Sequence, residues 1–253
     1  MTLVLVIKVK EGLVLASDSR MNFTDGRQSR DDATKLLTFE NHKHVAVLVS
    51  GEAIIEGGDD CAPKELLPKL ETIFNSKRLS IADYCEQLCT CFRKCYESAW
   101  ERLAENRKLS LYAQATIVFH VAGFDDNESD ARVHKLTLVG RTDHNTTSFG
   151  LKPTFSPFGK KMLQGNTYGI ACGGVCEVFE NVYRYDEELA QNPQNADGTW
   201  KIRDETSLQG AIDLACSVIE KSKKMNPHIG GLTRVCIITQ DDGLKCYNSV
   251  HHV

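Results

Sequence analysis

The 253-residue sequence lacks a long hydrophobic run. No apolar stretch approaches the roughly 20 residues that a membrane-spanning helix needs, so we expect no membrane span. The first residues also lack the regions of a secretory signal peptide, because Lys8 and Lys10 interrupt the apolar stretch. We therefore expect a cytoplasmic protein, and we interpret its ten cysteines for a reducing compartment, where disulfides are rare.

An excess of positive charge is absent as well. The formal net charge is -4, so the chain offers no basic footprint for nucleic acid. The sequence has only 6 prolines, no internal repeat and no Pro- or Gly-rich linker, which favours one domain over residues 1–253. Hydrophobic residues make up 42% of the chain, which is enough for a core of good size.

Several common site signatures are incomplete. The segment 172–179 ("CGGVCEVF") contains glycines before a predicted helix but lacks the lysine of a phosphate-binding loop. Cys85, Cys89, Cys91 and Cys95 share one predicted helix, where Cys85/Cys89 and Cys91/Cys95 are each one turn apart. A helix can offer two metal ligands in this way, whereas a structural zinc site needs about four in a closed set. We interpret these cysteines as small buried hydrophobic residues, and we expect no metal and no cofactor.

The hydrophobic periodicity predicts an α+β fold. The order of the elements is not the strict β-α alternation of a doubly wound sheet, and it suits two antiparallel sheets packed face to face with helices outside. Capping boxes at Ser80/Asp83 and Thr206/Gln209 mark two helix starts. Strands are predicted over 2–9, 13–19, 35–39, 44–49, 112–123, 132–139, 166–171, 232–239 and 244–249, helices over 64–76, 80–105, 175–189 and 206–225, and loops over 21–33, 151–165 and 191–205.

Thr2 begins the first predicted strand. A threonine hydroxyl is a poor nucleophile until a base removes its proton. When the threonine is the first residue, its own α-amine can be that base, because the ordinary pKa of the amine is roughly 8. A small second residue permits removal of Met1, which would expose this amine. The alternative is that Thr2 is an ordinary strand residue.

Three further residues support the nucleophile hypothesis. Asp18 ends the strand predicted to pair with the first one, and Lys35 begins another strand after a loop. A lysine near the threonine oxygen would favour its deprotonated form, and a carboxylate would orient that lysine. Gly51 ends a further strand and could present a backbone N–H to an oxyanion. A strand-end ion pair, a surface lysine and a turn glycine are the ordinary alternatives.

Taken together, "TLVLVIKVKEGLVLASDSR" (2–20), Lys35 and "LVSG" (48–51) resemble the opening of a proteasome β subunit. This resemblance implies an N-terminal-nucleophile hydrolase with a four-layer αββα sandwich. It places the nucleophile on Thr2, the structural acid on Asp18, the arginine on Arg20, the lysine on Lys35 and the oxyanion glycine on Gly51. The Asp-Ser-Arg strand, with no propeptide, also resembles the bacterial group called Anbu and, more distantly, HslV.

Three positions depart from the family pattern. Cys172 stands at the position of a family serine near the threonine amine. Asn226 and Ile229 stand where the family has an aspartate and a serine.

The resemblance implies a threonine-type peptide hydrolase. It would act on peptides or unfolded proteins inside a homo-oligomeric ring or helical assembly, and a regulatory ATPase is left open. A structural ring subunit without protease activity and an acylase or transferase on a small amide are the alternatives.

Overall fold

The computed structural model describes residues 2–22, 28–40, 42–51, 71, 72, 74, 79–102, 116–126, 128–141, 154–176, 191 and 193–248. The two predicted helices over 64–76 and 175–189 lie largely outside these residues. The strands are β1 (Leu3–Val9), β2 (Gly12–Ser17), β3 (Leu36–Thr38), β4 (Val45–Gly51), β5 (Thr116–Phe124), β6 (Ala131–Arg141), β7 (Thr154–Met162), β8 (Gly169–Gly174), β9 (Arg234–Thr239) and β10 (Gly243–Asn248), and the long helices are α2 (Ile81–Arg102) and α6 (Leu208–Met225).

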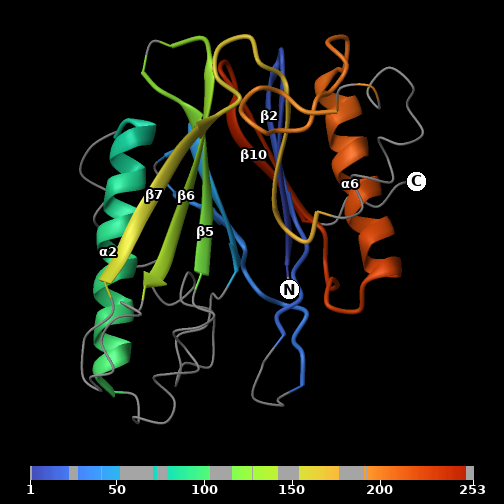
Figure 1. Ribbon diagram of the computed structural model, residues 1–253. Coiled ribbons are helices and arrows are strands. Elements are labelled where there is room, and N and C mark those ends of the chain that lie inside the picture. Colours follow the sequence, from blue (N-terminus) through green and yellow to red (C-terminus); the bar gives the residue numbers. More distant parts are fainter. Residues whose placement is uncertain are drawn as a thin grey trace.

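Two five-stranded antiparallel sheets pack face to face. One has the order β10-β9-β2-β1-β8, and the other has the order β3-β4-β5-β6-β7. Helix α2 covers the outer face of the second sheet and α6 covers the outer face of the first, as Figure 1 shows. This arrangement confirms the predicted α+β sandwich. No helix of the described segments combines the length and the apolar character that a membrane crossing requires.

Strand β1 is buried on both faces. Leu3, Leu5 and Ile7 pack against the cluster under α6, whereas Val4 and Val6 pack between the sheets. A third apolar cluster joins α2 to the second sheet. Because both faces are covered, the strand is a nearly continuous apolar run with little polar alternation.

Lys8 is the exception within β1, and it is only 2% exposed. Its Nζ lies 2.6 Å from Asp130 Oδ1 and donates to the carbonyl oxygens of Ala131, Leu163 and Gly165 at 2.7–2.8 Å. A buried ammonium is tolerated when it is paired in this way. Lys8 therefore ties β1 of one sheet to the segments that begin β6 and follow β7 of the other.

The prediction of a loop over 151–165 is wrong, because β7 occupies much of that segment. Pro157 and Gly159 lie within the strand, and both residues weaken the sequence signal for a strand. Among the described strands, β7 pairs with β6 alone and therefore lies at the edge of its sheet, which is where strands tolerate proline.

One of the two predicted capping boxes is present. The box of Ser80 and Asp83 is confirmed, since each side chain accepts a hydrogen bond from the other residue's backbone N–H. The box predicted at Thr206/Gln209 is wrong, because Ser207 is the N-cap and accepts from the Gly210 N–H at 3.1 Å, so α6 begins at Leu208, two residues later than predicted.

The predicted surface segment 191–205 is partly packed against β8. The backbones of Trp200 and Ile170 exchange two hydrogen bonds of 2.7 and 2.9 Å. Ile202 is buried in the cluster under α6.

Two disulfides differ from the expectation for a reducing compartment, where disulfides are rare. Cys236 and Cys246 are direct cross-strand partners in β9 and β10 and are bonded to each other. Cys172 and Cys176 flank the end of β8, with their Cα atoms 6.2 Å apart, and are also bonded. The sequence could not show these pairs, because each depends on a strand register or a turn that brings the two Cα atoms together.

Candidate active site

A buried ion pair lies beside the start of β1. The Asp18 side chain is fully buried, and its Oδ1 accepts from the Lys35 Nζ at 2.7 Å. The same oxygen accepts from the Leu3 N–H at 3.0 Å, and the Asp18 N–H donates to the Leu3 carbonyl. The predicted acid and lysine are therefore together, next to the residue that follows Thr2.

The second carboxylate oxygen of Asp18 is also held. Its Oδ2 accepts from the backbone N–H groups of Arg20 at 3.1 Å and Gly230 at 3.2 Å. An ionised carboxylate only accepts hydrogen bonds, so donors on both oxygens fix its orientation. The carboxylate in turn fixes the position of the Lys35 ammonium.

The backbone of Thr2 is held from the other side by the residues that end β8. Its carbonyl oxygen accepts from the Val175 N–H at 2.9 Å, and Leu3 pairs with Gly174. Gly174 has a φ of 82°, and a β-carbon there would overlap the Thr2 carbonyl oxygen. Only glycine combines this conformation with this close approach.

Gly51 ends β4 in the left-handed region, with a φ of 91°, and is exposed. Its strand lies beside the lysine, because the Val49 N–H donates to the Lys35 carbonyl at 2.8 Å. Ser50 Oγ lies 2.8 Å from the position that a β-carbon on Gly173 would take. The end of β4 therefore approaches the part of β8 that adjoins Thr2.

Behind this region lies a buried group of polar side chains that sequence patterns did not indicate. His120 Cε1 also lies 2.8 Å from the β-carbon position of Gly173. Within the described part of the chain, neither ring nitrogen of His120 has a hydrogen-bond partner, and neither do the hydroxyls of Ser17 and Ser50. Complete burial, with a smaller contribution from Lys135, lowers the pKa of His120 to about 3, so the ring is neutral near pH 7.

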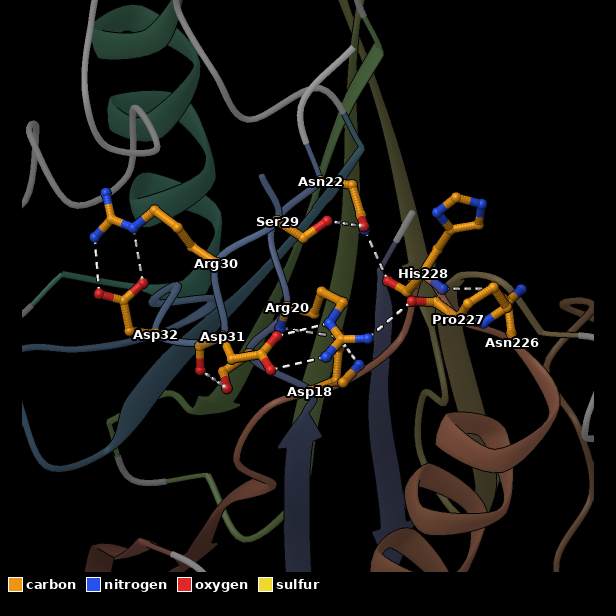
Figure 2. Close-up of polar contacts among 12 residues, drawn as sticks. Asp18, Arg20, Asn22, Ser29, Arg30, Asp31, Asp32, Asn226, Pro227 and His228 are labelled. Atoms are coloured by element: carbon orange, nitrogen blue, oxygen red, sulfur yellow. Dashed lines mark hydrogen bonds and ion pairs between the residues drawn. The ribbon is translucent and has the colours of Figure 1, made fainter. Parts of the chain in front are cut away.

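The side chain of Arg20 links the loop of Asp31 to the loop of Pro227, and it is the backbone N–H of Arg20 that contacts the Asp18–Lys35 pair. Its guanidinium binds both carboxylate oxygens of Asp31, at 2.6 and 2.8 Å, and donates to the Pro227 carbonyl at 2.9 Å (Figure 2). The hydrogen bonds between the two side chains raise the pKa of Arg20 and lower that of Asp31. A β-carbon on Gly230 would overlap the Arg20 guanidinium, so this loop packs directly on the arginine.

The residues at the three departures from the family pattern have other contacts. Cys172 is bonded to Cys176. Asn226 caps the end of α6 with its backbone N–H, and its side chain accepts from the His228 N–H at 2.9 Å (Figure 2). Ile229 is buried in the cluster under α6.

The cysteines of α2 that the structure describes pack against the core, as expected. Cys85 lies 3.7 Å from His134 Nδ1, and burial raises the pKa of its thiol to about 12. Cys89 and Cys91 are half-buried against the same cluster. Among the residues with described positions, no group of three or more His, Cys, Asp or Glu side chains could hold a metal ion.

Sequence reasoning identified the ion pair but missed the groups that hold it. Gly230 donates to Asp18 and Asp31 binds Arg20, although Gly230 and Asp31 lie far from each other in the sequence. The glycine pairs at 173–174 and 230–231 were the sequence signal for these contacts, because other parts of the chain pack too closely on them to leave room for a β-carbon.

The chain thus has two antiparallel sheets between helices, and its first strand starts beside a buried lysine–aspartate pair. The chain is similar to "Anbu (ancestral beta-subunit) from Yersinia bercovieri", with a TM-score of 0.58 and 14% identity over 98% of this chain and 88% of that one. It is also similar to an Anbu (Gly-1) mutant from Hyphomicrobium sp. strain MC1, with a TM-score of 0.56 and 12% identity over 100% of this chain and 89% of that one. The predicted resemblance is thus confirmed for the fold.

Comparison at the level of sequence adds nothing to this similarity. No family model and no curated protein matches the chain.

Proposed function

We propose that this chain is a threonine-type peptide or amide hydrolase, with Thr2 as the nucleophile after removal of Met1. The observation that carries this proposal is the buried Asp18–Lys35 pair, which is bonded to the backbone N–H next to Thr2. An ion pair without a chemical task would be more stable as apolar packing in many proteins, so its burial here supports a role in the reaction.

In the proposed reaction, the α-amine of Thr2 takes the proton from its own hydroxyl, and Oγ attacks the carbonyl carbon of the scissile amide. The ammonium of Lys35, oriented by Asp18, stabilises the developing negative charge on Oγ. The N–H of Gly51 stabilises the oxyanion, and the C–N bond breaks as the leaving amine takes the proton. Water then hydrolyses the acyl ester and regenerates Thr2.

A structural subunit of the same fold is the second candidate, and a specific observation favours it. Cys172, Asn226 and Ile229 stand at positions where the family has other residues that serve the amine. Here Cys172 is in a disulfide, Asn226 caps α6 and Ile229 lies in the core. A chain that has lost its proton relay would keep the fold and the ion pair without turnover.

Variants of Thr2 separate these candidates. Thr2→Ser keeps the hydroxyl and the amine and should retain part of the peptidase activity. Thr2→Ala keeps only the amine and should fold normally without activity. Blocking Met1 removal keeps the hydroxyl but turns the amine into an amide, which cannot accept a proton. Peptidase activity with Met1 shown intact by mass spectrometry would refute the mechanism, and an inactive, fully processed chain would favour the structural subunit.

Lys35→Ala tests the electrostatic part of the mechanism. Removal of a group that stabilises transition-state charge costs about 100-fold or more in turnover. Lys10→Ala is the matched control, because Lys10 is an exposed lysine at the far end of β1. Circular dichroism should show that both variants are folded, and an active Lys35→Ala protein would mean that the lysine only stabilises the fold.

A further inference from the structure

The turn that holds Thr2 is closed by a disulfide. The Val175 N–H binds the Thr2 carbonyl, and Gly174 pairs with Leu3. Cys172 precedes these two residues and Cys176 follows them, so the disulfide closes a loop around the segment in contact with Thr2. The bond therefore constrains the residues that position the proposed nucleophile.

Among the described residues, the backbone of this turn is held mainly by β1. Strand β8 pairs with β1 alone of the described strands and so lies at the edge of its sheet, while the side chain of Val175 packs against the cluster under α6. On the outer side, the backbone bridge to Trp200 is made at Ile170, four residues before Gly174. Gly173 and Gly174 carry no side chains that could anchor the turn, and glycine has the largest backbone freedom to lose.

The disulfide is also open to exchange with thiols. Cys172 and Cys176 are both half-buried rather than enclosed in the core, so the disulfide lies within reach of a small thiolate. Thiolate attack on a disulfide sulfur proceeds through a mixed disulfide and depends on this access.

We propose that Cys172 and Cys176 are a redox-modification site that sets the position of Thr2. In the oxidising direction, the two thiols lose two protons and two electrons to a small-molecule disulfide, which becomes two thiols. In the reducing direction, a small-molecule dithiol cleaves the Cys172–Cys176 bond and becomes a cyclic disulfide. Reduction releases the turn, weakens the Val175–Thr2 hydrogen bond and lowers activity; the activity part rests on the proposed function.

The chain contains a matched control. The Cys236–Cys246 disulfide joins β9 and β10 at the opposite edge of the same sheet. A Cys236→Ala/Cys246→Ala variant and a Cys172→Ala/Cys176→Ala variant each lose one disulfide and the same number of atoms. A general loss of stability would affect both variants, whereas a local effect on Thr2 would affect only the Cys172→Ala/Cys176→Ala variant.

The first measurement is amide hydrogen exchange of the segment containing Val175, with and without dithiothreitol. In the Cys236→Ala/Cys246→Ala protein, the reductant should increase exchange of this segment at least tenfold. In the Cys172→Ala/Cys176→Ala protein, exchange should be fast from the start and should not respond to the reductant. If either double variant fails to fold, the wild-type chain is titrated with dithiothreitol, and thiol alkylation at each cysteine is followed by mass spectrometry together with exchange.

Exchange at Val175 that stays unchanged while Cys172 and Cys176 become alkylated would overturn the proposal, and so would the absence of this disulfide from oxidised protein. The second measurement is peptidase activity, which should fall at least fivefold in step with alkylation of this pair. Constant activity during the reduction would overturn the functional part. A chain that is inactive in both states but shows the exchange response would refute the proposed hydrolase while the redox site stands.

Discussion

His120 shows what a single buried residue contributes to this fold. Its imidazole is completely buried between the sheets, and its nitrogens have no partner among the described residues. A buried polar group without a partner costs about 1–3 kcal/mol, and a charged imidazole would cost more. The low pKa of about 3 expresses this preference for the neutral ring.

The pKa of His120 predicts a pH dependence of stability. In the unfolded chain a histidine has a pKa of about 6.5, so below that pH the unfolded state binds more protons than the folded state. The free energy of unfolding should therefore be constant above pH 6.5 and fall by up to about 1.4 kcal/mol per pH unit toward pH 3. Urea unfolding at pH 7.5 and 5.0 measures this fall in the free energy of unfolding. The fall should be smaller in His120→Leu than in wild type by about 2 kcal/mol.

His228→Leu is the control for loss of a histidine, because its imidazole is exposed rather than buried. His120→Leu should be about as stable as wild type at pH 7.5, because it removes the unpartnered nitrogens. Equal losses of unfolding free energy in His120→Leu and wild type between pH 7.5 and 5.0 would contradict the lowered pKa of His120.

At the scale of residues, the sequence predicted the groups that lie at strand ends. Asp18 and Lys35 each adjoin a strand with a clear apolar signal. Strands β2 and β3 belong to different sheets, so the two residues were brought together by the resemblance to proteasome β subunits and not by strand pairing. His120 and Ser50 could not be predicted, because they meet Gly173 only when the two sheets pack face to face. No local pattern specifies which residues oppose each other across that layer.

At the scale of elements, the turns after β7 and β8 illustrate two uses of glycine. Gly165 and Gly174 both have positive φ values, 55° and 82°. A β-carbon on Gly165 would meet no atom within 4 Å, whereas one on Gly174 would overlap the Thr2 carbonyl oxygen. The first glycine is needed for its backbone conformation alone, and the second is needed for space as well.

Alanine substitution should separate these two requirements. Gly165→Ala should lose roughly 1–2 kcal/mol of stability, the cost of a left-handed conformation, and keep its activity. Gly174→Ala should lose more stability and most activity, because the turn must move away from Thr2. Urea unfolding and peptide hydrolysis measure the two effects, and equal behaviour of the two variants would contradict a special role for the Gly174 contact.

The strands and helices themselves were largely predictable. Apolar runs located most strands to within a few residues, because both faces of the sheets are buried, and period-3.6 apolar patterns located α2 and α6. Strand β7 was missed since an edge strand tolerates proline and carries a weak pattern. The Cys172–Cys176 and Cys236–Cys246 disulfides were not predicted, because they depend on a turn and a strand register that no periodic sequence pattern shows.

At the scale of the whole molecule, most apolar side chains of α6 and of the described part of α2 are covered by the sheets. The buried side chains of α6 pack against the first sheet, and those of α2 pack against the second. Among the described residues, the large exposed apolar side chains are Met225, Leu232 and Tyr247. These side chains are the candidates for subunit contacts in the predicted self-association.

We predict a symmetric assembly with a mass well above that of the 28.2 kDa chain. Multi-angle light scattering across micromolar concentrations measures this directly. Met225→Lys combined with Leu232→Lys should reduce the mass if these side chains lie in subunit contacts, and Lys224→Ala is a control at an exposed neighbouring position. A stable monomer in the wild-type protein would contradict the prediction.

The Lys8 contacts also have a consequence for how this chain folds. The oxygens around the ammonium belong to residues 122 to 157 positions away from Lys8. The ammonium cannot leave water until these oxygens are in place, and contacts of such long range form only after large loops have closed. Joining of the two sheets at this end is therefore expected among the last steps of folding, and the Lys8 contacts should oppose unfolding more than they accelerate folding.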